Sequence, residues 1–156
     1  MTQLVFVSLD REAVLALRSG AGRPICLGCA ATAGLMSTLG PDTATDELEF
    51  AALNSAGVLS LSTTTDPLRL VVAAEVASAQ LIDLGGPAGQ VSVRDLRWAQ
   101  VHALFGDEPA AAPAVAQARA AVGAMDLADA LSVPEVTALL DSFDLLWFAP
   151  EELDDL

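Results

Sequence analysis

The chain contains no lysine and no tyrosine, and its seven basic residues are all arginine. The 21 acidic residues outnumber them, so the formal net charge is −14. A surface this acidic repels phosphate backbones and anionic lipid headgroups. We therefore expect no nucleic-acid partner and no attachment to a membrane surface.

Long apolar runs and targeting signals are missing as well. No apolar segment approaches the roughly 20 residues that a membrane-spanning helix needs. The N-terminal residues lack the positive charge of a signal peptide and lead directly into the apolar run Leu4–Val7. We therefore expect a cytoplasmic protein, and we expect residues 1–156 to form one globular domain with one core.

The residues that most enzymes rely on are scarce. His102 is the only histidine, and no Gly-x-Ser-x-Gly nucleophile elbow is present. The Gly85–Gly89 segment is glycine-rich but lacks a phosphate-loop pattern, and no lysine is available to reach a phosphate. The sequence therefore predicts no catalytic residue, no metal ligand set and no cofactor, and it favours a non-enzymatic protein.

Three apolar segments predict the interior of a sheet. Leu4–Val7 and Leu68–Val76 are apolar on both faces at their middle, which is typical of inner strands. Leu145–Phe148 is a short apolar run cut off by Pro150, and we expect it to lie inside the sheet too. Trp147 would then be mostly buried, and its truncation to alanine would cost about 3–5 kcal/mol.

Helical patterns lie between these runs. The first predicted helix begins after Asp10, and the next three span Ala33–Leu39, 44–62 and 114–124. A fifth ends near Asp141, and a last one begins at Pro150. Val91–Val93 reads as an edge strand, and 94–105 as a short helical turn followed by a strand. The fold class is α/β, with α+β as the alternative, built as a mixed β-sheet of about four to six strands packed by helices. Any parallel unit at the start of the chain would have a right-handed crossover.

Several short stretches resemble a family of uncharacterised actinobacterial proteins, a domain of unknown function. The C-terminal stretch Asp144-Leu-Leu-Trp-Phe148 with its Glu-Leu-x-x-Leu tail is the main one. Asp46–Leu53, Leu70–Val76, Leu4–Val7 and the pair Val101-His102 also match. The resemblance covers most of the chain, and it implies a fold but no activity.

Cys26-Leu-Gly-Cys29 has the Cys-x-x-Cys spacing of redox sites and of half a zinc site. No second cysteine pair is present, and His102 alone cannot complete four zinc ligands. Free cysteine is among the most buried residue types. We therefore interpret Cys26 and Cys29 as small buried side chains, with a redox role as the third functional hypothesis.

Two acidic clusters are candidate binding sites. They are Asp46, Glu47 and Glu49, and then Glu151, Glu152, Asp154 and Asp155. Converging carboxylates hold Mg²⁺ or Ca²⁺ or act as an acid/base pair, whereas carboxylates at a helix start also complement the helix dipole. The candidate binding residues are Glu47, Glu49, Glu151, Glu152 and Trp147, the last because a tryptophan beside acidic residues can line a small pocket.

Our first functional hypothesis is a cytoplasmic, non-enzymatic domain that acts through protein–protein contacts, with a homodimer as one form. Apolar residues make up 53% of the chain, which favours an exposed apolar patch. The alternative is a small-molecule-binding or metal-dependent enzyme built on the 46–49 and 151–155 segments. That alternative requires the two segments to lie close together in the fold.

Overall fold

Strand β1 (Thr2–Ser8) places its apolar side chains alternately in two cores. Phe6 lies in the core on one face of the sheet, while Val5 and Val7 lie in the core on the other. Strand β3 (Leu70–Ala77) is also buried on both faces. β1 lies between β2 (Arg23–Cys29) and β3, and β3 lies between β1 and β6 (Val101–Gly106), so both are inner strands as predicted.

The structure, a computed structural model, describes residues 1–156. Its seven strands form one sheet in the order β4-β5-β2-β1-β3-β6-β7. The remaining strands are β2 (Arg23–Cys29), β4 (Leu81–Asp83), β5 (Gln90–Leu96), β6 (Val101–Gly106) and β7 (Leu146–Phe148). The α-helices are α1 (Arg11–Arg18), α2 (Ala33–Leu39), α3 (Thr45–Thr63), α4 (Ala112–Val122), α5 (Leu127–Ala130) and α6 (Pro134–Ser142). Four 3₁₀ turns complete the chain: η1 (Ser78–Gln80), η2 (Trp98–Gln100), η3 (Pro109–Ala111) and η4 (Pro150–Asp155).

The expectation of a mixed sheet of four to six strands is wrong, because there are seven strands and every pairing is antiparallel. The short length of helix α1 explains why β1 and β2 are antiparallel. Its eight residues span about 12 Å, half the length of about 24 Å expected for the seven residues of β1. The helix is too short to carry the chain back for a parallel strand, so no crossover forms.

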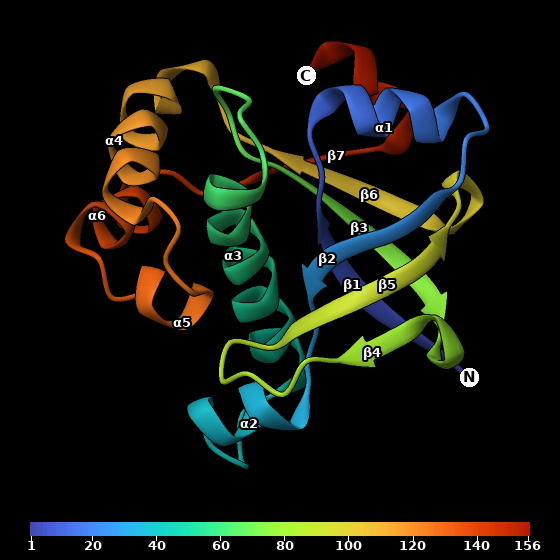
Figure 1. The fold of residues 1–156 in the computed structure, drawn as a ribbon, viewed down its shortest axis with the longest axis horizontal. Coiled ribbons are helices and arrows are strands. Elements are labelled where there is room, and N and C mark those ends of the chain that lie inside the picture. Colours follow the sequence, from blue (N-terminus) through green and yellow to red (C-terminus); the bar gives the residue numbers. More distant parts are fainter.

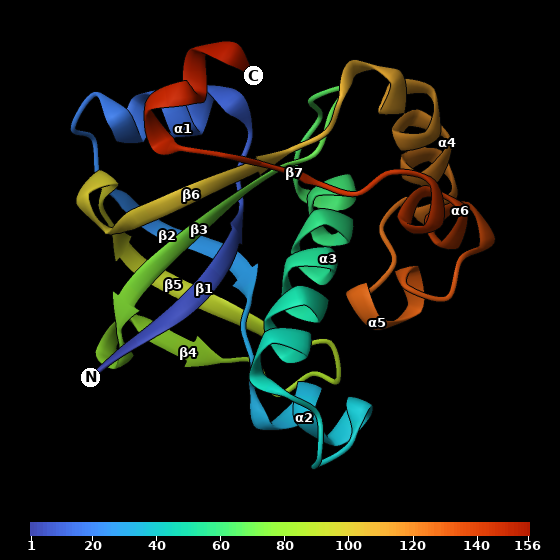
Figure 2. The ribbon, with the colours of Figure 1, turned by 180° about the vertical axis from the view of Figure 1, so that it is seen from behind.

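Helix α3 and helix α1 cover opposite faces of the curved sheet (Figures 1 and 2). We call the two apolar layers the α3-side core, which also includes residues of α4, α5 and α6, and the α1-side core, which includes Leu153 of η4. Ser8 of β1 donates a hydrogen bond of 2.6 Å to the carbonyl oxygen of Ala56, which ties the sheet to α3. Asp10 caps α1, accepting a hydrogen bond from the Ala13 amide at 2.7 Å. None of the helices combines the length and apolar character needed to cross a bilayer.

The predictions for residues 81–106 are confirmed in part. A 3₁₀ turn, η2, leads into strand β6, which confirms the helical turn and strand expected within 94–105, but residues 94–96 still belong to strand β5. Strand β5 is not an edge strand, because β4 pairs along its outer side. β4 has only three residues, which is too short for an alternating pattern to be recognised.

Candidate functional site

An ion pair between Arg69 and Asp107 is buried where β3 begins and β6 ends. Asp107 accepts hydrogen bonds from Arg69 Nε at 2.8 Å, from Arg69 Nη2 at 2.6 Å and from the Arg69 backbone amide at 2.9 Å. Both side chains have no exposed surface. Nη2 also donates to the carbonyl oxygen of Phe143 at 3.0 Å, in the segment that enters β7. The pair therefore fixes the position of the C-terminal strand.

Gly57 of α3 lies next to the Arg69 side chain and to Leu145. A Cβ atom at Gly57 would lie 3.1 Å from Leu145 Cδ1 and 3.6 Å from Arg69 Nη1. Nη1 is buried without a hydrogen-bond partner. The pair is therefore charge-balanced but not fully hydrogen-bonded, which makes it sensitive to the loss of either side chain.

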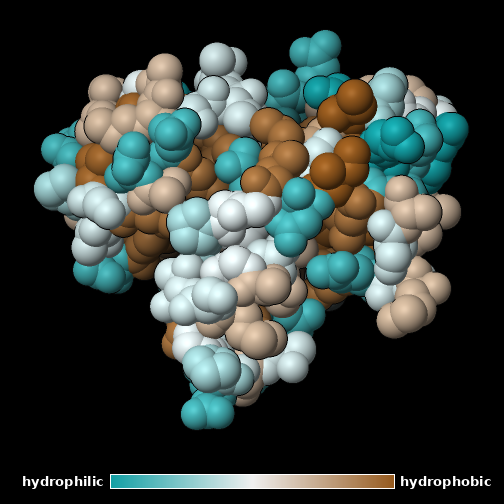
Figure 3. Space-filling view, turned by 60° about the horizontal axis from the view of Figure 1, so that its bottom comes forward, coloured by the Kyte–Doolittle hydropathy of each residue, from teal (hydrophilic) through white to brown (hydrophobic).

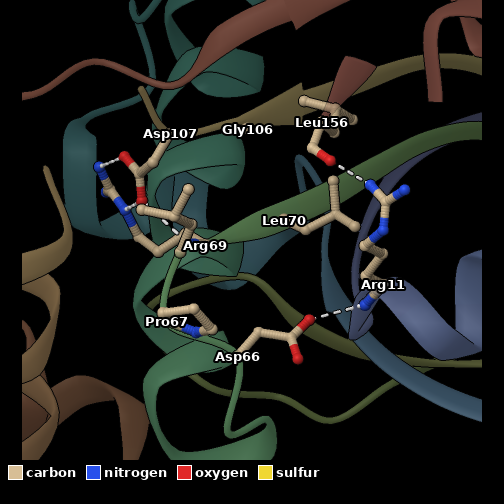
Figure 4. A pocket seen from close by; sticks show the side chains of 9 residues that line it. Arg11, Asp66, Pro67, Arg69, Leu70, Gly106, Asp107 and Leu156 are labelled. Atoms are coloured by element: carbon tan, nitrogen blue, oxygen red, sulfur yellow. Dashed lines mark hydrogen bonds and ion pairs between the residues drawn. The ribbon is translucent and has the colours of Figure 1, made fainter. Parts of the chain in front are cut away.

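A cavity of about 240 Å³ opens beside the ion pair (Figure 4). The lining residues are Arg11, Asp66, Pro67, Leu68, Arg69, Leu70, Gly106, Asp107 and Leu156. In Figure 4 the Arg69 side chain points away from Arg11, so that the two arginines lie on opposite sides of Leu70. Its lining combines apolar residues with the partly exposed Arg11 and Asp66, a mixture found in small-molecule sites.

Arg11 connects the start of α1 to the C-terminal segment. Its backbone amide donates to Asp66 Oδ2 at 2.7 Å. Its Nη1 donates to the carbonyl oxygen of Leu153 at 3.2 Å and to that of Leu156. Sequence reasoning missed this contact and the Arg69–Asp107 pair, because the partners are far apart in the chain. The nearest signal in the sequence is Arg69 itself, a charge next to a strongly apolar strand.

Strand β7 lies at the edge of the sheet, and the prediction that it is an inner strand is wrong. It pairs only with β6, where Trp147 lies opposite Phe105. Trp147 is 60% exposed and Leu146 is 41% exposed, so the expectation of a buried Trp147 is wrong as well. The run is apolar because the residues that flank Leu146 and Trp147 are packed: Leu145 lies in the α3-side core, and the half-buried Phe148 packs against the α1-side core.

The exposure of Trp147 changes the expected effect of its substitution. We predict that Trp147→Ala alters the free energy of unfolding by less than about 1 kcal/mol, as is usual for surface positions. Urea unfolding followed by circular dichroism measures this change. A loss of 3 kcal/mol or more would show that the indole is packed in solution, contrary to the exposure seen here.

The acidic clusters lie at opposite ends of the molecule. Glu47 and Glu49 are in the first turns of α3, next to α2, whereas Glu151 and Glu152 are in η4 beside α1 (Figures 1 and 2). No three His, Cys, Asp or Glu side chains gather where they could hold a metal ion. Glu47 instead lines a shallow hollow with Phe50. The fold does not bring the two clusters into a shared site.

Cys26 and Cys29 are buried free thiols on opposite faces of β2. Cys26 lies in the α1-side core and Cys29 in the α3-side core. Burial raises the pKa of Cys26 to about 11, against a smaller lowering by Arg23, and burial raises the pKa of Cys29 to about 12. The thiolate, the reactive form, is therefore scarce at neutral pH. The two sulfur atoms face different cores, so this geometry does not pair them.

A comparison with known families gives one match. The model of a family of unknown function (DUF6912) matches residues 4–156, nearly the whole chain. The search of curated proteins and the search of solved structures each found no match. The expected resemblance to a domain of unknown function is therefore confirmed, and the chain belongs to this family.

Proposed function

We propose that this chain is a cytoplasmic, non-enzymatic domain that acts through contacts with another protein or with a second copy of itself. The observation that supports the proposal is Trp147, 60% exposed on an edge strand. Tryptophan is enriched among the residues that contribute most to interface affinity. An edge strand also presents unpaired backbone N–H and C=O groups to an incoming chain.

Other large apolar side chains reach the surface, but they lack this combination. The most exposed internal ones are Ile25 at 64%, Phe50 at 56% and Ile82 at 49%. Figure 3 looks at the molecule with the bottom of Figure 1 turned forward, and the hydrophobic groups on that surface are interrupted by hydrophilic ones. Single exposed apolar residues are normal on a protein surface. The other edge strand, β4, also presents free backbone groups beside the exposed Ile82. The β7 edge differs because its exposed side chain is a tryptophan.

Photo-crosslinking in the native host tests the proposal. A crosslinking amino acid in place of Trp147 should give a discrete product of higher mass, whereas the same amino acid in place of Ile82, on the opposite edge strand, should not. Size-exclusion chromatography with light scattering identifies whether the product contains a second copy. A strictly monomeric protein without a discrete product at position 147 would contradict the proposal.

A second candidate function is the binding of a small molecule in the cavity between Arg11 and the Arg69–Asp107 pair. The cavity volume of about 240 Å³ and a lining that combines apolar residues with Arg11 and Asp66 favour a small ligand. A thermal-shift screen over metals, nucleotides and metabolites tests this. A ligand present at a hundred times its Kd stabilises the native state by about 2.7 kcal/mol. A screen without any shift would remove this candidate.

A further inference from the structure

The free side of β7 carries features that define a type of partner. The strand is extended and unpaired on its outer side, so another extended chain can hydrogen-bond to its backbone and lengthen the sheet. We propose that the partner of this domain is an extended segment rich in arginine or lysine that adds to the sheet along β7. This inference rests on the proposed function and specifies the chemistry of the partner.

The charges at the two ends of β7 support a basic partner. Asp144 precedes the strand and Glu151 follows it, and both are exposed. Neither carboxylate takes part in an ion pair within the chain. The whole molecule carries a net charge of −14, which attracts a cationic segment over long distances. Binding should therefore weaken as salt screens these charges.

Trp147 lies between these two charged ends and would make the specific contact with the partner. Its indole lies on the α3-side face of the sheet, opposite Phe105, and 60% of the residue is exposed. The added strand would place one side chain of the partner next to the indole on the same face. An arginine or lysine there would form a cation–π contact, for which tryptophan is the best aromatic partner.

A second copy of the chain fits the same edge less well. If two β7 strands paired antiparallel about Trp147, Asp144 of one copy would lie opposite Pro150 of the other and next to its Glu151. Like charges close together across an interface oppose association. Each copy also carries a net charge of −14. A basic segment of a different protein can hydrogen-bond to the free backbone groups of β7 and also carries the opposite charge to Asp144 and Glu151.

Selection from a library of random 12-residue peptides on the full chain tests the proposal. We expect the selected peptides to be cationic and to bind at least tenfold more weakly to Trp147→Ala, a difference of about 1.4 kcal/mol. Combined Asp144→Asn and Glu151→Gln substitutions should also weaken binding, as should raising NaCl from 50 to 500 mM. Ile82→Ala on the opposite edge is the matched control and should bind as the wild type does.

Backbone methylation tests strand addition separately. N-methyl groups on alternate residues of a selected peptide should abolish binding in one of the two registers, because only one set of N–H groups faces β7. Equal binding of both methylated peptides would overturn strand addition.

The remaining outcomes separate this inference from the proposed function. Neutral or acidic selected peptides, cationic peptides that bind Trp147→Ala as tightly as wild type, or no enriched peptides would overturn the basic partner. A dimer that forms through β7 and is lost in Trp147→Ala would also overturn it, while supporting protein contacts as the function. If no basic peptide is selected and the crosslinking amino acid at position 147 also gives no product, both the basic partner and the proposed function are contradicted.

Discussion

Replacing Asp107 by alanine should lower the free energy of unfolding by about 3–5 kcal/mol, because it leaves the buried guanidinium of Arg69 without its counter-charge. Three hydrogen bonds to Asp107 are lost, and Arg69 Nη1 already lacks a partner. A domain of this size has a total stability of about 5–15 kcal/mol. The melting temperature should fall by roughly 6–20 °C, which calorimetry measures.

Two further variants show whether charge burial is the cause. Asp154→Ala removes the carboxylate of the exposed pair with Arg18, whose side chains are 35% and 72% exposed, and should cost less than about 1 kcal/mol. Combining Arg69→Met with Asp107→Asn removes both buried charges and retains an acceptor for the Arg69 backbone amide. This double variant should be more stable than Asp107→Ala. A double variant as unstable as the single one would show that packing, and not the unpaired charge, is responsible.

Raising the pH from 9 to 11 should destabilise the protein by roughly 3–5 kcal/mol, through Cys26 and Cys29. Burial raises the pKa of these thiols from 9.0 to about 11 and about 12. Below pH 9 both the folded and the unfolded thiols are protonated, so the contribution to stability is fully present. Above pH 9 the unfolded thiols ionise first, which favours unfolding, and the contribution is lost as pH rises toward the folded pKa values.

The composition makes this measurement clean. The chain has no lysine and no tyrosine, the other side chains that titrate between pH 9 and 11. Urea midpoints measured across this range should fall steeply in the wild type and stay nearly level in a Cys26→Ala, Cys29→Ala variant. A thiol reagent at pH 8 should react with both cysteines only after unfolding. Fast reaction in the native state would show that a thiol is exposed, and it would favour the redox hypothesis.

The sequence identified the inner strands because their burial leaves a local pattern. β1 and β3 are apolar on both faces, which is the pattern typical of strands covered on both sides. Local spacing in 94–105 also predicted a helical turn followed by a strand, which the structure places at 98–106. Hydrophobic periodicity therefore predicted the centre of the sheet.

The edge of the sheet could not be predicted in the same way. The run from Leu145 to Phe148 is as apolar as an inner strand, but Leu145 accounts for most of its burial while Trp147 faces solvent. Nothing in the sequence around them shows that Leu145 is buried and Trp147 is exposed. The Arg69–Asp107 pair joins residues 38 apart in sequence, and the cavity is lined by residues from equally distant parts of the chain. Both are products of tertiary packing and leave no periodic signal.

The order of the strands has a consequence for folding during synthesis. The three central strands, β2, β1 and β3, all lie in the first 77 residues. β5 then joins the free side of β2, β6 joins β3, and β7 joins β6, while β4 pairs only with β5. No strand has to insert between two that are already paired. The sheet can therefore grow outward from its centre in the direction of translation, with β7 added last.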